Sequence, residues 1–269
     1  MIFRKYLYSL GLGVKETMMY RADFFMTLAS AAFPIMIQVF MWQALYNGAG
    51  TGELFGRDHA QMMAYSVSAA ILWRLLRTGF EYDINEDIKN GGLSKYVIRP
   101  VGYLPYRMSC FLGQKIGTLL GGLTLMVLAL SLVGLAFHTA PVTLSGVLLF
   151  LPALLMALVL NFLIFFCVGM WAFWLSEIGF LFEAVRIVIV VLSGGIFPLE
   201  IFGNTMRAVL KCLPFSWAVG FPVDVLTGAA AGGEVLAGLA AQAVWIGLMF
   251  LLSAFLWRLG SSKYLAAGG

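Results

Sequence analysis

The sequence contains very little charge. Asp, Glu, Lys and Arg make up 11% of its 269 residues, whereas hydrophobic residues make up 61%. Soluble globular domains have about a quarter charged and about half apolar residues, so this composition, with a mean hydropathy of +0.93, excludes that class. The net charge of +4 is a small excess that does not favour nucleic-acid binding. We therefore expect an integral membrane protein.

Cysteine and histidine are also scarce. Cys110, Cys167 and Cys212 are far apart in sequence and lie in apolar surroundings. This pattern favours packing residues over a disulfide framework or a zinc site. His59 and His138 fall at predicted ends of membrane spans, with no cysteine or carboxylate cluster nearby. We expect no metal site.

The sequence also lacks a G-x-x-x-x-G-K-[ST] phosphate loop. The nearest string, GQKIGTLLG at 113–121, begins an apolar segment rather than following a strand. No pattern of nucleophile and base predicts a catalytic residue either. We expect a chain that is not an enzyme and binds no cofactor itself.

Long apolar segments predict an all-α polytopic membrane protein, formed as a single transmembrane domain over 1–269. About 20 apolar residues are needed to cross a bilayer core of about 30 Å. Before the first such run, residues 1–21 show helical spacing of apolar residues and predict an amphipathic helix on the membrane surface, not a removable signal peptide. The six predicted spans are 24–46, 59–77, 112–137, 144–174, 178–199 and 235–257.

A different apolar segment lies between the fifth and sixth spans. Residues 206–226 are interrupted by Pro214, Gly220 and Pro222, and the pieces are too short to cross. Broken backbone at membrane depth is tolerated where it is buried in protein or faces water. We expect a re-entrant or interfacial helical hairpin here.

The basic residues indicate the orientation of the chain. Most of the 17 Lys and Arg lie in the N-terminal tail, between spans two and three, and near the C-terminus. Basic residues accumulate on the cytoplasmic side. Both termini and the loop between spans two and three are therefore predicted to be cytoplasmic.

This loop is the most charged part of the chain. Asp83 and Glu86 have a spacing close to that of a capping box, and Gly91 is a typical helix stop, which together predict a short helix at 83–90. Ile84 and Ile88 would share one face. The polar helix is either a docking element for a soluble partner or a solvated connection.

Several segments together resemble the permease subunits of type-two ABC exporters, the six-span ABC-2 family transporter branch. They are DIKNGGLSKYVIRPVGYLPY (87–106), LSGGIFPLEIFG (192–203), LPFSWAVGFPVDVLTG (213–228) and WRLGSSKYLAAGG (257–269), preceded by Tyr20-Arg21. Each motif is weak, but their order relative to the six spans is more specific.

The resemblance implies both partners and site residues. The permease would pair with an identical or related permease in a bacterial cytoplasmic (inner) membrane, and two copies of an ABC ATPase would bind ATP and Mg²⁺. The short cytoplasmic helix would be the coupling helix. The implied ATPase-facing residues are Asp83, Glu86, Asp87, Lys89, Leu93, Tyr96 and Arg99, and those of the outer hairpin are Pro214, Trp217, Pro222 and Asp224.

Charged and small residues within the spans leave alternatives open. Glu183 and Arg186 are spaced to pair along one helix, as a gate or substrate contact or as a structural ion pair with, for example, Arg74 or Arg77. A secondary transporter would use Glu183 as its proton carrier, but no inverted repeat is evident. Asn161 and Gln242 are typical helix-to-helix hydrogen-bonding residues, and Gly113, Gly117 and Gly121 allow close packing within one subunit or between two.

Overall fold

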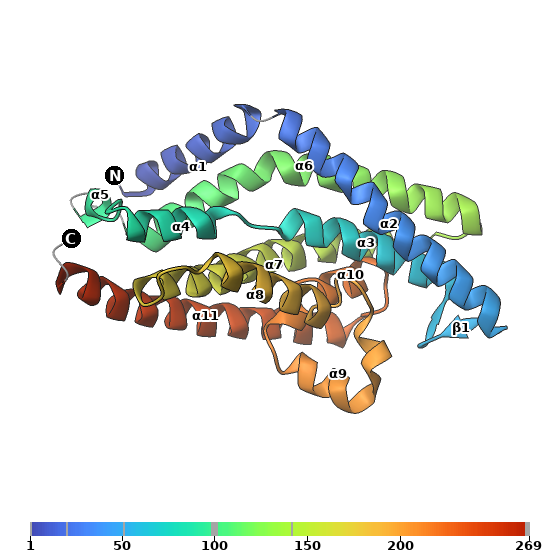
Figure 1. Ribbon diagram of the computed structural model, residues 1–269. Coiled ribbons are helices and arrows are strands. Elements are labelled where there is room, and N and C mark those ends of the chain that lie inside the picture. The colour runs from blue at the N-terminus through green and yellow to red at the C-terminus, as the bar shows by residue number, and fades with distance from the viewer. Residues whose placement is uncertain (1, 20, 51, 98–101, 141, 267–269) are drawn as a thin grey trace.

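The protein is a bundle of helices that contain about 82% of its residues (Figure 1). The computed structural model describes residues 2–19, 21–50, 52–97, 102–140 and 142–266. The α-helices are α1 (Ile2–Met19), α2 (Arg21–Ala49), α3 (His59–Leu76), α4 (Phe80–Lys89), α5 (Ser94–Val97), α6 (Tyr103–Phe137), α7 (Leu144–Met170), α8 (Gly179–Leu192), α9 (Gly203–Lys211), α10 (Gly220–Leu226) and α11 (Gly233–Ala266). Three 3₁₀ helices, η1 (Trp171–Phe173), η2 (Leu199–Phe202) and η3 (Phe215–Trp217), and strands β1 (Glu53–Leu54) and β2 (Arg57–Asp58) complete the fold.

The long helices run along one axis, so the molecule has two distinct ends (Figure 1). The start of α1 and the end of α11 lie at the same end as α4 and α5, whereas the β1–β2 hairpin and α9 lie at the opposite end. We call these the terminal end and the hairpin end. The shared position of the two chain ends agrees with an even number of crossings.

Helix α7 is the centre of the packing. Its most apolar 18-residue window is 56% buried within the chain, compared with 17% for each of α6 and α11. Helices α3, α4, α10 and α11 all pack against α7. Large apolar side chains of α7, including Phe162, Leu163 and Phe166, are completely buried. α7 is therefore the axis against which the functional segments are positioned.

Within the described residues, three helices are long and apolar enough to cross a membrane: α6, α7 continued by η1, and α11. A fourth crossing results if Leu199–Lys211 and Phe215–Leu226, which meet at a bend of 103°, are counted as one broken span. The predicted number of six spans stays a prediction. The multi-pass character is clear from these helices alone.

The first two helices follow the long helix α6. At 35 residues, α6 is about 52 Å long, which exceeds a hydrocarbon core of about 30 Å. Helix α1, expected on the membrane surface, packs closely against the part of α6 near Gly113. The glycine face of α6 is thus used, at this position, for packing within one chain.

Two segments differ from their expected bounds. Helix α8 ends at Leu192 although 178–199 was predicted as one helix, because the chain turns at Gly194, with φ of +82°, and packs against Tyr65 and Gly220. Helix α4 begins at Phe80, and its N-cap residue is Gly79, which makes no side-chain hydrogen bond. Asp83 therefore lies inside the helix, and the predicted capping box at Asp83 is wrong. Burial of Phe80 on the same face as Ile84 and Ile88 accounts for the earlier start.

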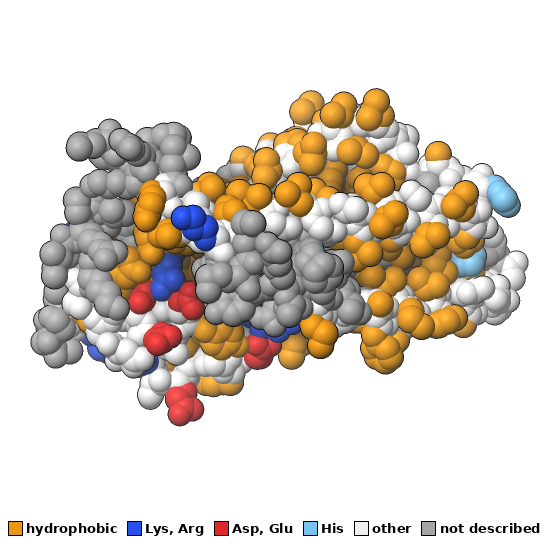
Figure 2. Space-filling view, turned by 90° about the horizontal axis from the view of Figure 1, so that it is seen from above, with side chains coloured by type: hydrophobic (Ala, Val, Ile, Leu, Met, Phe, Trp, Pro, Cys, Tyr) orange, Lys and Arg blue, Asp and Glu red, His pale blue; other side chains and the backbone are white. Residues whose placement is uncertain are grey.

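The surface differs between the two ends. In the view of Figure 2, acidic and basic side chains gather over the half toward the terminal end, while hydrophobic side chains cover most of the other half. A broad apolar surface is what a bilayer requires of a membrane-embedded region. On this face, a polar partner would therefore find most charged side chains in the half toward the terminal end.

Candidate functional site

The candidate site is a break in the helical path between α3 and α4. Residues Arg77, Thr78 and Gly79 separate the two helices, and Gly79 has φ of −151° and ψ of −12°. A helix that ends inside a bundle leaves its last four carbonyl groups without partners in the helix. Here the Arg77 amide donates to Trp73 O at 3.1 Å and to Arg74 O at 3.3 Å. The remaining carbonyl groups are bonded by other helices.

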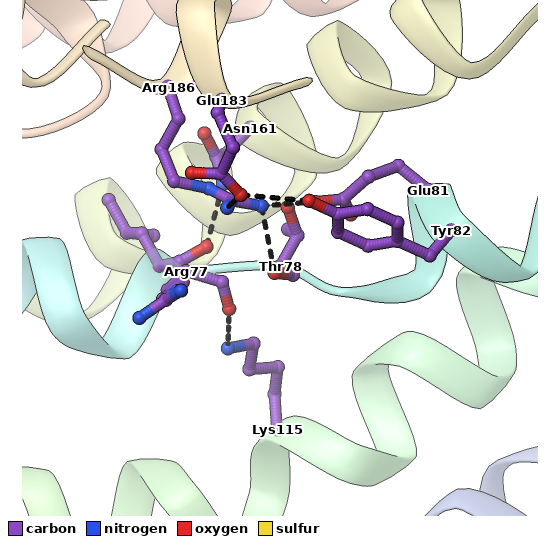
Figure 3. A network of polar contacts seen from close by, with 9 residues as sticks. Arg77, Thr78, Glu81, Tyr82, Lys115, Asn161, Glu183 and Arg186 are labelled. Atoms are coloured by element: carbon purple, nitrogen blue, oxygen red, sulfur yellow. Dashed lines mark hydrogen bonds and ion pairs between the residues drawn. The ribbon is translucent and has the colours of Figure 1, made fainter. Parts of the chain in front are cut away.

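Three helices send a polar side chain to this break (Figure 3). Lys115 of α6 donates through Nζ to Leu75 O at 2.7 Å and also to Arg77 O. Asn161 of α7 donates to Leu76 O at 2.6 Å. Arg186 of α8 donates to Thr78 O at 3.4 Å. The break is thus held from three sides, and positive charge lies at the C-terminal end of the α3 dipole, where it is favourable.

Arg186 also joins two carboxylates from different helices. Its guanidinium pairs with Glu183 on the same helix and with Glu81 on α4. Glu81 is fully buried, and burial raises its pKa, against the opposing effects of its hydrogen bonds and of Arg186. Tyr82 of α4 donates to Glu183 at 2.8 Å. Two polar contacts therefore connect α4 with α8, one through Arg186 and one through Tyr82.

The predicted pairing of Glu183 with Arg186 is confirmed. An ion pair with another helix was the second alternative, and it is formed by Arg186 with Glu81 of α4 rather than with the suggested Arg74 or Arg77. Sequence reasoning missed Glu81 and Lys115, because the sequence does not distinguish Glu81 from the exposed carboxylates that follow it on α4. Asn161 was predicted to make a helix-to-helix bond, and this is confirmed.

The residues predicted to face an ATPase lie on α4, on α5 and in the turn between them. Asp83, Glu86 and Lys89 are exposed. Leu93 is buried at 2% exposure, and Tyr96 is half-buried against the rings of Tyr103 and Tyr106. Arg99 lies outside the described residues. Among the described residues of this set, the exposed side chains are those of Asp83, Glu86 and Lys89 on α4.

Arg107 of α6 fixes this part of α4. Its guanidinium pairs with Asp83 at 3.1 Å and with Asp87, which also accepts a bond of 2.8 Å from the Tyr103 hydroxyl. Gly91, with φ of +73°, occupies the expected helix stop, and Leu93 N bonds to Asp87 O at 3.0 Å. Asp87 therefore holds α4 to α6, whereas the exposed side chains of Glu86 and Lys89 are available to a partner.

The hairpin end has its own charged cluster. Phe55 and Gly56, with φ of 55° and 74°, form the tight turn between β1 and β2. Arg57 follows, and its guanidinium contacts Asp224 of α10 at 2.6 Å and Glu200 of η2 at 3.6 Å. Burial acts to lower the pKa of Arg57, but Asp224 and Glu200 raise it overall. The cluster ties the hairpin to α10.

The remaining residues of the predicted outer hairpin lie around this cluster. Pro214 precedes η3, and Trp217 donates from Nε1 to Lys211 O at 3.0 Å. Pro222 is buried in the first turn of α10, two residues before Asp224. Gln242 of α11 donates to Trp217 O at 2.8 Å and to Ala153 O at 3.1 Å, which confirms its predicted role between helices.

Two cavities open beside the hairpin-end cluster. One measures about 340 Å³ and the other about 230 Å³, and both are lined by Arg57, Glu200 and Arg207. Arg207 pairs with Glu200 at 2.9 Å. The sequence offered no signal for this cluster, since Arg57 and Asp224 are 167 positions apart.

The apolar crossings, the central α7 and the broken helix held by charged groups define a multi-pass α-helical membrane protein. The chain belongs to the ABC-2 family transporter proteins, whose family description it matches over residues 32–268. A comparison with curated proteins finds no match. Membership in this family identifies the chain as a permease component of an ABC transporter rather than its catalytic ATPase.

Proposed function

We propose that this chain forms the translocation pathway of an ATP-binding-cassette exporter. A second permease, identical or related, completes the pathway, and two separate ATPase subunits bind ATP and Mg²⁺ and drive it. The complex lies in a bacterial inner membrane, with both chain termini in the cytoplasm. Family membership and the lack of a phosphate loop in the sequence support this proposal.

The observation that carries the proposal is the polar surface of α4 at the terminal end. Glu86 and Lys89 are exposed there, next to a helix turn that Asp87 and Leu93 stabilise from within. A soluble ATPase requires a polar, well-positioned surface, and this one is fixed to α6 through Arg107. We assign α4 and α5 as the coupling element, in which Asp83, Glu86 and Lys89 contact the ATPase.

Transport then follows from coupled motion of the two ends. ATP binding draws the ATPase subunits together and moves α4 and α5 of each permease. The paired bundles change from inward-open to outward-open, and the hairpin of α9 and α10 closes the outer mouth between cycles. Pro214, Trp217, Pro222 and Asp224 belong to this closure.

The alternative of an ion-coupled secondary transporter is less well supported. It would require Glu183 to take up and release a proton during each cycle. Both Arg186 and Tyr82 donate to the Glu183 carboxylate. Two donors favour the ionised form of a carboxylate, so this residue is better suited to a permanent link than to proton transfer.

Copurification tests the proposed coupling surface. We expect the tagged chain, purified from its native membrane, to retain an ABC ATPase, and the Glu86→Ala/Lys89→Ala variant to lose it. The matched control is Lys211→Ala/Glu234→Ala, which removes the same two charges from exposed positions near the hairpin end. Retention by the first variant, or failure of the unaltered chain to retain an ATPase, would contradict the proposal.

A further inference from the structure

We propose that Arg186 is the positioning residue that transmits movement of α4 to α8, and through α8 to the hairpin end. This inference rests on the proposed function, because it assigns the route by which a signal from an ATPase reaches the outer mouth. The route is a chain of side-chain and backbone bonds, all of them within one subunit.

The bonds at the helix break divide into two groups. The carbonyl groups of Leu75, Leu76 and Arg77 are held by α6 and α7, through Lys115 and Asn161. Beyond them, Thr78 O and the Glu81 carboxylate are held by Arg186 of α8. At the break itself, the α3 side is held by α6 and α7, and the α4 side is held by α8. Farther along, α4 is also held to α6 through Arg107 and packs on α7. A movement of α4 about Gly79 would therefore act directly on α8 through Arg186.

Arg186 is suited to this role by its geometry. A guanidinium is planar and presents five donors in a fixed fork, which a lysine ammonium group cannot imitate. One terminal nitrogen of Arg186 pairs with Glu183, and the other bonds both Glu81 and Thr78 O. The residue is 8% exposed and Glu81 is 0% exposed. Water therefore cannot readily replace the bonds to Glu81 and Thr78 O when α4 moves.

The rings beside Arg186 reinforce the connection. Tyr82 and Phe182 meet edge to face with centroids 5.0 Å apart, and the Tyr82 hydroxyl donates to Glu183 at 2.8 Å. The backbone of α4 packs mainly on α7 and η1. The connection from α4 to α8 is consequently made by side chains, and Arg186 provides its buried, charged part.

The far end of α8 is bonded to the hairpin end. Gly220 N of α10 donates to Ser193 O at 2.7 Å, and the Tyr65 hydroxyl donates to Gly194 O at 2.9 Å. A Cβ atom on Gly220 would lie 2.9 Å from Ser193 O, so the two backbones are in direct contact. Asp224, which holds Arg57, follows on the same short helix. α8 thus connects α4 with the charged cluster around Arg57 at the hairpin end.

Hydrogen exchange of the intact complex tests the route. The permease with its copurified ATPase is measured with and without a non-hydrolysable ATP analogue. In the unaltered complex we expect the analogue to change deuterium uptake in 80–89 and also in 179–195. In Arg186→Gln we expect the change in 80–89 to persist and the change in 179–195 to fall about fivefold or more, the low end of typical couplings between sites.

Two further variants make the result decisive. Arg258→Gln removes the same group from an exposed position on α11 and should leave both responses intact. Glu81→Gln/Arg186→Gln removes the link without leaving a buried carboxylate unpaired, and replaces the single variant if that one does not assemble. A full response of 179–195 in the double variant would overturn the inference alone. Absence of any response in 80–89 of the unaltered complex would overturn the proposed function, and the inference with it.

Discussion

At the scale of single residues, the end of α3 shows how a membrane protein accommodates a broken helix. Trp73 O and Arg74 O are bonded by the Arg77 amide, and the next two carbonyl groups by Lys115 and Asn161. A buried carbonyl group without a partner is expensive, and lipid offers no substitute. The polar residues in the apolar helices α6 and α7 therefore have a clear structural reason to be there.

Replacing Asn161 with leucine tests this account. The two side chains have the same number of heavy atoms in the same branched arrangement, but Asn161→Leu leaves Leu76 O unbonded in a site that is 1% exposed. We expect a loss of about 1–3 kcal/mol in the free energy of unfolding, measured as a lower midpoint of thermal unfolding in detergent. Asn204→Leu, on the exposed surface of α9, is the control. Equal shifts for both variants would argue against a role for the carbonyl bond.

The buried pair of Glu81 and Arg186 makes a second prediction about stability. Arg186→Gln leaves the fully buried Glu81 without its cation, and breaking a buried pair from one side costs about 3–5 kcal/mol. Adding Glu81→Gln should recover part of that loss, because no charge is then left uncompensated. Thermal unfolding of both single variants and the double variant gives the coupling energy. Strictly additive losses would mean that the two side chains do not depend on each other.

Some of these residues could be identified from the sequence. Asn161, Gln242 and the Glu183–Arg186 pair were predictable, because polar groups are rare in apolar helices and residues three apart share a helix face. Glu81 was not predictable, since its burial depends on how α4 lies against α7. Nor was the Arg57–Asp224 contact, which joins positions 167 apart. Local spacing reveals neighbours along a helix, but contacts across the fold depend on the tertiary arrangement.

At the scale of elements, the crossing of α1 and α6 depends on two glycines. A Cβ atom on Gly13 would lie 2.2 Å from Cys110 O, and one on Gly113 would lie 2.1 Å from Leu10 O. Such distances are too short for any side chain, so the helices must separate when either glycine is replaced. The pattern of 1–21 predicted a helix, and α1 is a helix that contacts α6 at Leu10 and Gly13.

Alanine substitutions test this crossing. We expect Gly13→Ala and Gly113→Ala to weaken the packing of α1, seen as faster protease cleavage within residues 2–19 and a lower unfolding midpoint. Gly11→Ala has nothing within 4 Å of the added methyl group. It should be neutral, or stabilising by up to about 1 kcal/mol through helix propensity. If Gly11→Ala and Gly13→Ala behaved alike, close contact would not explain the glycines.

The bounds of α8 and α4 show where local sequence patterns fail to predict the ends of a helix. The apolar run of 178–199 predicted one long helix, but α8 has 14 residues because Gly194 adopts a positive φ and lets the chain approach Tyr65 and Gly220. The charged pattern at 83–90 predicted a start at Asp83, but burial of Phe80 extends α4 by another turn. In both cases a tertiary contact outweighs the local signal.

At the scale of the whole molecule, the two ends carry different chemistry. The terminal end contains the start of α1, the end of α11, the exposed Glu86 and Lys89 of α4, and the ion pairs of Arg107. The hairpin end contains the Arg57 cluster and its two cavities. Basic residues concentrate toward the terminal end in the sequence, so the positive-inside rule predicts that this end faces the cytoplasm, as we propose. In that orientation α8 would lie between the cytoplasmic coupling element and the outer cluster around Arg57.

Thiol labelling tests this orientation, and the chain already contains one reporter. Cys212 is exposed and follows α9 at the hairpin end, whereas Cys167 is buried. With Cys110 and Cys167 replaced by alanine, we expect Cys212 to react in intact spheroplasts with a maleimide that does not cross membranes. In a variant without native cysteines, Glu86→Cys should react only after the membrane is permeabilised. Both positions lie on exposed surfaces, so accessibility alone does not separate them. The reverse pattern would place α4 outside the cell, where no ATPase could reach it.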